Sequence, residues 1–164
     1  MFLTLKMPSD YGNNCVKSLN NKEVKTLSQS QQLLGADAQF FSHLREGRFM
    51  IQRSAGTGRF VFYPRMICPG TGKRDLTFEE VSGRGEIYAT TAVQRPEKYG
   101  GNYNLCLVEL EEGVRMLSRV VDVDPDQVHI GMKVQASLEC VNFGTFKDSD
   151  QPVVVFRPAE EEGV

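Results

Sequence analysis

The sequence contains no tryptophan and only two histidines, His43 and His129, among its 164 residues. Enzymes that use a Ser-His-Asp or Cys-His arrangement need a histidine held by a third group, and a structural zinc site needs four clustered cysteine or histidine ligands. Neither pattern occurs here, and we expect both histidines to be surface or packing residues. We therefore expect a protein that is not catalytic on its own.

Strong charge of one sign and long apolar stretches are also missing. Nineteen Lys and Arg against 21 Asp and Glu give a net charge of −2, which argues against strong non-specific binding to nucleic acids. No stretch approaches the roughly 18 apolar residues of a membrane-spanning helix, and Lys6 interrupts the N-terminal apolar residues too early for a signal peptide. The scattered cysteines predict free thiols in a cytoplasmic, reducing compartment: Cys15, Cys68, Cys106 and Cys140.

The two ends of the chain differ in composition from the middle. The first 35 residues include a stretch, Ser18 to Gln32, that is dominated by Ser, Asn, Gln and Lys. Because such a stretch has little apolar surface to bury, we expect residues 1–35 to form a mobile or loosely docked tail. The other interpretation is an arm that becomes ordered on a partner subunit. Residues 160–164 form a short acidic tail.

One helix is predicted, over Ala36–Arg48. Its apolar residues recur at three- and four-residue spacing, as on one face of a helix: Phe40, Phe41 and Leu44. Asp37 is predicted as the N-cap residue, and Gly47 as the C′ residue that ends the helix.

The rest of the chain has the pattern of short strands. Residues 49–53 and 59–63 flank a glycine-containing loop of hairpin length, and Glu111-Glu112-Gly113 has the form of a second hairpin turn. Further strands are predicted at residues 77–81, 85–93, 104–110, 114–121, 134–138 and 152–156. Many short strands and one helix indicate a mostly-β protein, and a five-stranded OB-fold barrel fits the number of strands.

Several short motifs follow one another in a distinctive order. They are the turns at 54–57 and 68–71, Tyr63-Pro64-Arg65, Val81-Ser82-Gly83-Arg84-Gly85, 107–115, 121–125, 130–134 and Phe156-Arg157-Pro158-Ala159. Over about residues 38–159 the chain resembles the family of acyl-CoA-associated OB-fold proteins that carry a rubredoxin-like zinc ribbon. The resemblance implies a helix and ribbon within residues 36–77 and an OB-fold barrel over residues 78–159.

The resemblance also implies a function. Members of this family are typically small non-catalytic subunits bound to a thiolase-fold partner, which is a thiolase, an acyltransferase or a thiolase-like aldolase. By this resemblance we expect an accessory subunit of a hetero-oligomer that organises the complex and shapes its acyl or CoA channel. A coenzyme A thioester would then be the substrate of the complex, with no tightly bound cofactor in this chain.

The chain departs from the family at the zinc ligands. The usual ribbon has a CxxC pair in each of two turns, called knuckles, whereas the corresponding residues here are Ser54, Thr57, Cys68 and Thr71. One thiolate and three neutral hydroxyls are a poor ligand set for Zn²⁺, so we expect no metal. Hydrogen bonds from the hydroxyls, or burial against a partner, would have to replace the metal's contribution to folding.

Coenzyme A has phosphates, an adenine and a long arm, which need cations, flat side chains and a groove. The candidate contacts are basic residues near loops together with one tyrosine: Arg65, Lys73, Arg74, Arg95, Lys98 and Tyr99. We hypothesise that the loop at residues 95–103 and the ribbon face line one channel shared with the partner. The alternative is that the loop is merely solvated.

Other interpretations remain open at the level of sequence. OB-fold barrels also bind single-stranded nucleic acid, but the acidic pI of about 5.7 is unfavourable for this function. Five aromatic residues could contact a partner subunit or form the core of the ribbon itself: Phe40, Phe41, Phe60, Phe62 and Tyr63.

Overall fold

The computed structural model describes residues 35–141 and 150–159. Its elements are α2 (Ala36–Arg45), β1 (Met50–Ser54), β2 (Phe60–Val61), β3 (Leu76–Glu80), β4 (Arg84–Val93), the 3-10 helix η2 (Glu97–Tyr99), β5 (Tyr103–Leu110), β6 (Arg115–Ser118), the 3-10 helix η3 (Pro125–Gln127), β7 (Lys133–Cys140) and β8 (Pro152–Pro158). Apart from Gly35, the two predicted tails, residues 1–35 and 160–164, lie outside the described residues. Within the described part, no helix has the length and apolarity needed to cross a membrane.

Helix α2 begins at Ala36 as predicted, but its N-cap is Gly35 and it ends at Arg45, before the predicted Arg48. The carbonyl of Gly35 already accepts a hydrogen bond from the Gln39 N–H, so the helix begins at Ala36 and Asp37 lies in its first turn. The prediction of Asp37 as the N-cap is therefore wrong, although an acidic residue in the first turn still complements the helix dipole. The prediction for Gly47 is confirmed, since it has a φ of 75° and donates its N–H to the carbonyl of Leu44.

The ribbon is built on a three-stranded antiparallel sheet in the order β2-β1-β3. The predicted hairpin is confirmed by the pairing of Arg53 with Phe60 between β1 and β2. On the other side of β1, strand β3 pairs over its whole length, from Met50 with Glu80 to Ser54 with Leu76. The strand predicted at residues 77–81 is thus part of the ribbon sheet.

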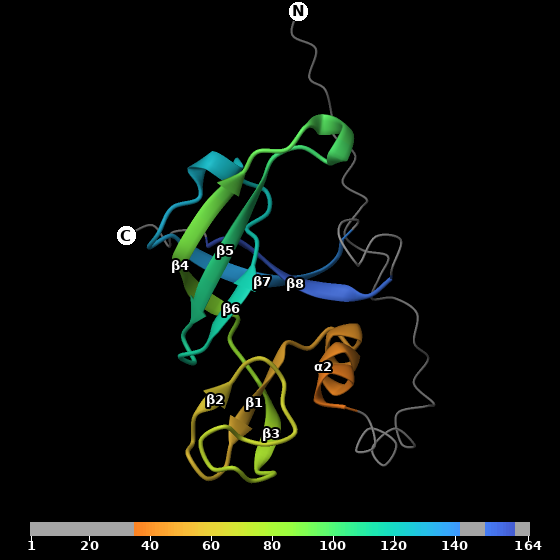
Figure 1. Cartoon of the computed structure of the whole chain (residues 1–164), viewed down its shortest axis with the longest axis vertical. Helices are drawn as coiled ribbons and strands as arrows, with labels where there is room; N and C mark the ends of the chain where they lie inside the picture. The colour runs from red at the N-terminus through yellow and green to blue at the C-terminus, as the bar shows by residue number, and fades with distance from the viewer. Residues whose placement is uncertain (1–34, 142–149, 160–164) are drawn as a thin grey trace, which may run out of the picture.

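The second sheet is the curled, five-stranded half-barrel of an OB fold, in the order β6-β5-β4-β7-β8 (Figure 1). Its two outer strands are brought together by a parallel bridge between Val120, just after β6, and Phe156 on β8. Hydrogen bonds from the Val121 N–H to the Phe156 carbonyl and from the Phe156 N–H to the Arg119 carbonyl, 2.8 and 2.9 Å long, hold this bridge. The mostly-β prediction with an OB-fold domain is confirmed.

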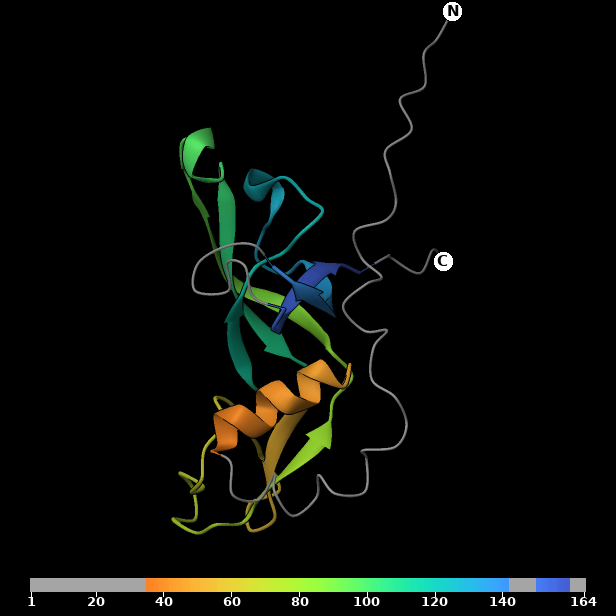
Figure 2. The ribbon, with the colours of Figure 1, turned by 90° about the vertical axis from the view of Figure 1, so that its right-hand side faces the viewer.

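One hydrophobic core joins helix, ribbon and barrel, and α2 lies between the two sheets (Figure 2). Phe40 is buried in this core, and its ring packs edge-to-face against Phe62 with 5.8 Å between centroids. Phe41 and Phe60 are half-buried against the same core. Of the five aromatic residues considered for an interface, only Tyr63 is strongly exposed, at 55%.

The remaining histidine and cysteine predictions have mixed outcomes. His43 packs against the ring of Phe78 at 5.0 Å, and His129 is exposed, so both are surface or packing residues. Cys68 and Cys106 are free and buried, whereas Cys140 is disulfide-bonded. The prediction of free thiols is therefore wrong for Cys140, because spacing along the sequence does not show which cysteines a fold brings together.

Candidate functional site

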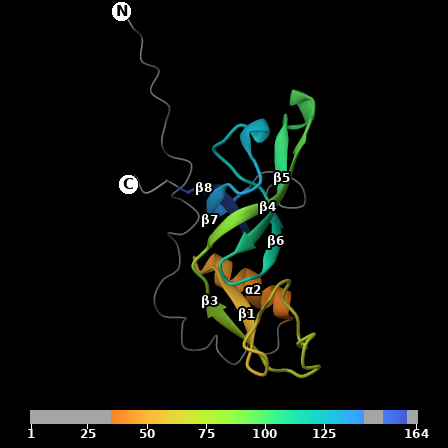
Figure 3. The ribbon, with the colours of Figure 1, turned by 90° about the vertical axis from the view of Figure 1, so that its left-hand side faces the viewer.

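The six candidate contacts for coenzyme A lie in two separate places. Arg65, Lys73 and Arg74 belong to the ribbon, whereas Arg95, Lys98 and Tyr99 belong to the loop between β4 and β5. This loop and the ribbon lie at opposite ends of the long β4–β5 hairpin (Figure 3). Within one subunit, therefore, the two groups do not line a common channel.

The β4–β5 loop presents a cationic and aromatic tip. The Lys98 ammonium lies 4.9 Å from the centre of the Tyr99 ring, and the Arg95 guanidinium lies 5.9 Å from it. Tyr99 is 58% exposed. The backbone of the loop is held by Asn102, whose side-chain oxygen accepts a hydrogen bond of 2.8 Å from the Arg95 N–H. Such a tip can bind an anion or a flat group at the surface.

A groove of about 520 Å³ lies between the ribbon and the β5–β6 hairpin. It is lined by Phe60, Val61, Phe62, Arg65, Pro69, Glu109, Gly113, Val114 and Arg115. Arg115 forms an ion pair of 3.1 Å with Glu109, and its guanidinium stacks 3.4 Å from the centre of the Tyr88 ring. The groove is thus lined by apolar side chains together with two arginines, Arg65 and Arg115.

The loop that carries Arg65 is held by a buried glutamine. Gln52 on β1 is only 4% exposed. Its side-chain amide donates a hydrogen bond of 2.9 Å to the carbonyl of Arg65 and accepts one of 2.6 Å from the N–H of the same residue. Three large apolar side chains of this loop nevertheless face solvent, with exposed fractions of 46–55%: Tyr63, Met66 and Ile67. We call residues 63–67 the apolar loop. Sequence analysis missed Gln52, although a glutamine directly after the apolar residues Met50 and Ile51 of the same strand is a visible signal.

The two knuckles bring together the four positions where the family carries cysteines. Gly58 donates its N–H to the carbonyl of Ser54, and Gly72 donates its N–H to the carbonyl of Cys68, both at 2.8 Å. Ser54 and Cys68 are essentially inaccessible, at 0% and 1% exposure.

These residues do not fit a zinc ion. The hydroxyls of Ser54 and Thr71 donate hydrogen bonds to a neighbouring carboxylate, and the Ser54 oxygen also accepts one from the Thr57 N–H. Cys68 is the only thiol among the four positions. Within the described ranges, no group of three or more His, Cys, Asp or Glu side chains is placed to hold a metal. Hydroxyls used in this way are not ligands for a borderline-soft ion.

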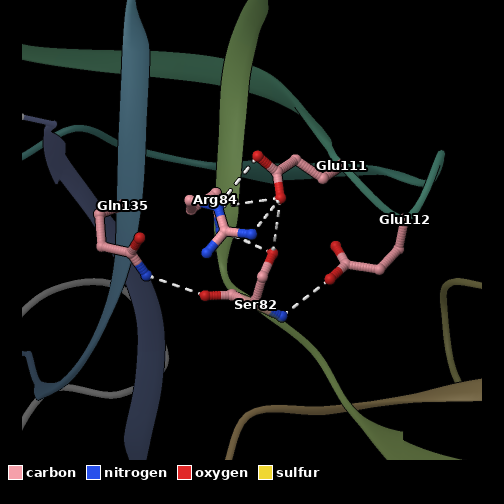
Figure 4. A network of polar contacts seen from close by, with 5 residues as sticks. All are labelled: Ser82, Arg84, Glu111, Glu112 and Gln135. Atoms are coloured by element: carbon pink, nitrogen blue, oxygen red, sulfur yellow. Dashed lines mark hydrogen bonds and ion pairs between the residues drawn. The ribbon is translucent and has the colours of Figure 1, made fainter.

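A polar clamp fixes the segment that connects ribbon and barrel (Figure 4). Glu111, in the β5–β6 turn, accepts hydrogen bonds of 3.0 and 2.9 Å from the Arg84 Nε. Its neighbour Glu112 accepts a hydrogen bond of 2.8 Å from the Ser82 N–H. From the other side, the Gln135 side chain donates a hydrogen bond of 3.1 Å to the Ser82 carbonyl. Gly83 between them has a φ of 70°, and a Cβ there would lie 2.9 Å from Ala136. The same turn borders the groove, so the clamp positions both walls.

We expect this clamp to weaken in acid. The hydrogen bond from Arg84 lowers the pKa of the Glu111 carboxyl below its ordinary value of about 4.3. Because the pKa is lower in the folded than in the unfolded state, the stabilisation is complete above the ordinary value and disappears as pH falls through the folded one. An NMR titration of the Arg84 Nε–H should give a midpoint below 4.3, and Glu111→Gln should remove it. A midpoint at or above the ordinary value would contradict the assignment.

Comparisons with known proteins agree with this architecture. Residues 41–77 match a family model described as the rubredoxin-like zinc ribbon domain of ChsH2, and residues 78–139 match the C-terminal OB-fold domain of ChsH2. A DUF35 domain-containing scaffold protein of Pyrococcus furiosus is 34% identical over 101 residues, which cover 60% of this chain and 74% of that relative.

Two further matches extend the comparison. A probable enoyl-CoA hydratase alpha subunit of Thermomonospora curvata is 32% identical over 126 residues, or 75% of this chain but 37% of that relative. A chain of the solved Ltp2-ChsH2(DUF35) aldolase is 30% identical and aligns with a TM-score of 0.63, covering 75% of this chain and 94% of that chain. The chain therefore belongs to the family of DUF35-domain proteins, in which a rubredoxin-like ribbon precedes a ChsH2-type OB-fold domain.

Proposed function

We propose that this protein is a non-catalytic accessory subunit of a cytoplasmic thiolase-fold complex, and that it helps to shape the acyl-CoA channel of that complex. The observation that carries the proposal is the ribbon, which places a rigid apolar loop next to a groove containing two arginines. The family supports it, since one relative is named a scaffold protein and the similar solved structure is an aldolase with a ChsH2 component.

The apolar loop is the surface that we assign to the partner subunit. Exposed aromatic and aliphatic side chains that are already fixed in place lose little entropy on binding, and such residues dominate interface energies. The two hydrogen bonds between the Gln52 side chain and the Arg65 backbone provide this fixation. Tyr63 and Ile67 are 55% and 51% exposed and would become buried against the partner.

The groove is the place that we assign to the acyl-CoA. Guanidinium groups bind phosphate through paired hydrogen bonds, and apolar walls accommodate the pantetheine arm. Arg65 supplies the cation, and Phe60 and Phe62 supply apolar wall in the same groove. Arg65 also follows directly after Tyr63 and Pro64, which we assign to the partner surface. Lys73 and Arg74 lie on the second knuckle of the same ribbon. The distant β4–β5 loop is assigned no contact with the same ligand molecule.

Arg65→Ala is expected to raise the KM of the complex for acyl-CoA about tenfold, the effect of losing one or two charge-assisted hydrogen bonds. The matched control is the double variant Arg95→Ala/Lys98→Ala, which removes equal or greater charge at the other end of the molecule. It should change KM less than about twofold. Steady-state kinetics of the purified complex measure both values. The assignment is wrong if the double variant has the larger effect.

The function itself is tested by comparing the thiolase-fold partner alone with the complex. The partner to test is the thiolase-fold protein whose gene lies nearest to that of this chain, and it should gain acyl transfer or carbon–carbon bond activity on a CoA thioester when this protein is added. This protein alone should turn over no substrate. An unchanged rate at saturating concentrations of the added chain would refute the proposal.

Binding of single-stranded nucleic acid is less well supported. Such proteins offer aromatic faces on which bases stack. The exposed Tyr99 at the tip of the β4–β5 loop is one such face, but on the barrel strands the Tyr88 ring is covered by Arg115 and the Tyr103 ring has Arg119 at 4.7 Å from its centre. One exposed ring does not form a row on which successive bases stack, so a gel shift at low salt should show no stable complex.

A further inference from the structure

We propose that the carboxylate of Asp75 takes the structural place of the zinc ion in this ribbon and joins the two knuckles. Asp75 lies just before β3, and its two oxygens point to different knuckles. Oδ2 accepts hydrogen bonds of 3.0 Å from the Ser54 hydroxyl and 3.1 Å from the Gly56 N–H in the first knuckle. Oδ1 accepts a hydrogen bond of 3.0 Å from the Thr71 hydroxyl in the second knuckle.

The backbone places this carboxylate independently of its side-chain contacts. The carbonyl of Asp75 accepts a hydrogen bond of 2.9 Å from the Ala55 N–H, which extends the β1–β3 pairing by one step beyond Ser54 and Leu76. Asp75 is thus aligned with the first knuckle by the sheet itself. Its side chain then needs only to reach across to the second knuckle.

In this ribbon a negatively charged group surrounded by hydrogen-bond donors replaces a positively charged ion surrounded by thiolates. The residues at the former cysteine positions fit this change of sign. A Zn²⁺ ion is a cation that binds thiolates, whereas a carboxylate is an anion that needs hydrogen-bond donors. Ser54 and Thr71 supply donors where the family has cysteines. Thiolates at these two positions would repel Asp75, and neutral thiols would be weaker donors. With hydroxyls at Ser54 and Thr71, each oxygen of the Asp75 carboxylate accepts a hydrogen bond from one of the two knuckles.

The glycines of the knuckles show that the carboxylate is closely surrounded. A Cβ at Gly56 would lie 2.7 Å from Asp75 Oδ2 and 2.9 Å from the Thr71 methyl group. A Cβ at Gly70 would lie 3.3 Å from the Thr57 methyl group. Partial burial raises the pKa of the Asp75 carboxyl, but the hydrogen bonds from Thr71, Ser54 and Gly56 together outweigh it and hold the pKa below its ordinary value. The carboxylate therefore remains charged at neutral pH.

The test combines metal content with local amide exchange in the full chain. Wild-type protein produced in zinc-supplemented medium is analysed by elemental mass spectrometry, and hydrogen exchange is followed at Gly56 and Thr57. Asp75→Ala should lower the protection of these two amides about tenfold or more, because both acceptor oxygens are lost. Asp75→Asn should have the smaller effect, because its remaining oxygen can still accept from the Ser54 hydroxyl and the Gly56 N–H.

Glu80→Gln is the matched control, since it removes a carboxylate from the same ribbon sheet that only forms a surface ion pair of 3.5 Å with Arg48. It should leave the protection of both knuckle amides unchanged. If Asp75→Ala does not fold, the zinc content of the wild-type protein still tests the proposal. Zinc bound in a one-to-one ratio to wild-type protein, or protection kept within about twofold in folded Asp75→Ala, would overturn the proposal.

Discussion

Replacing Ser54, Thr57 and Thr71 together with cysteine, in a chain that already carries Cys68, is expected to produce a protein that binds one zinc ion. The knuckle turns already have the required backbone hydrogen bonds, from Gly58 to Ser54 and from Gly72 to Cys68. A four-cysteine site in such turns binds zinc with an apparent free energy of about 10–16 kcal/mol in small zinc domains. Most of that binding energy would stabilise the ribbon.

Metal analysis and thermal unfolding with and without a chelator measure this outcome. The unfolding temperature of the triple variant should fall sharply when a chelator is added, whereas that of the wild type should stay the same. Adding Asp75→Asn to the triple variant should raise its zinc affinity, because the carboxylate that Ser54 and Thr71 now contact would repel two thiolates. A triple variant that folds but binds no zinc would show that the knuckles do not have zinc-ribbon geometry.

The double substitution Tyr63→Asp/Ile67→Asp is expected to weaken binding of the thiolase-fold partner by about 100-fold or more. Central interface residues each contribute about 2 kcal/mol or more, and a factor of ten corresponds to about 1.4 kcal/mol. The fold should hardly change, since both side chains are exposed and the loop is held through Gln52 and the Arg65 backbone. Substitutions at exposed sites usually alter stability by about 0.5 kcal/mol or less.

Titration of each variant against the labelled partner, together with its unfolding temperature, gives the result. Ile130→Asp is the matched control, because Ile130 is an even more exposed isoleucine, at 67%, and lies on the barrel before β7. It should bind like the wild type. Should the control lose binding and the double variant keep it, the partner surface would be on the barrel and not on the apolar loop.

Much of the fold was predictable because a turn depends on a few residues that are adjacent in the sequence. Gly47 ends the helix where predicted, and the Glu111-Glu112-Gly113 turn joins two strands, with the Gly113 N–H donating to the Leu110 carbonyl at 2.9 Å. Such turns account for the β1–β2 and β5–β6 pairs, whereas β1 also pairs with β3, and β4 with β7, across intervening elements. The N-cap of α2 was less predictable, because Gly35 and Asp37 are both acceptable residues near a helix N-terminus.

The parts of the site that sequence analysis missed depend on contacts between distant residues. Asp75 reads as an ordinary turn residue before a strand, and only the pairing of β3 with β1 brings it beside Ser54. The clamp is similar, since Arg84 and Glu111 are 27 residues apart. Conversely, Arg65 and Arg95 look equivalent as basic loop residues, and only the length of the β4–β5 hairpin separates them.

The mass of the complex that this protein forms tests its role as an accessory subunit most directly. The chain is produced together with the thiolase-fold protein whose gene lies nearest, purified through a tag on the chain and analysed by native mass spectrometry. We predict a hetero-oligomer that contains both chains and no zinc bound to this subunit. A protein that leaves the column alone, with the partner present in the lysate but unbound, would contradict the proposed role as an accessory subunit.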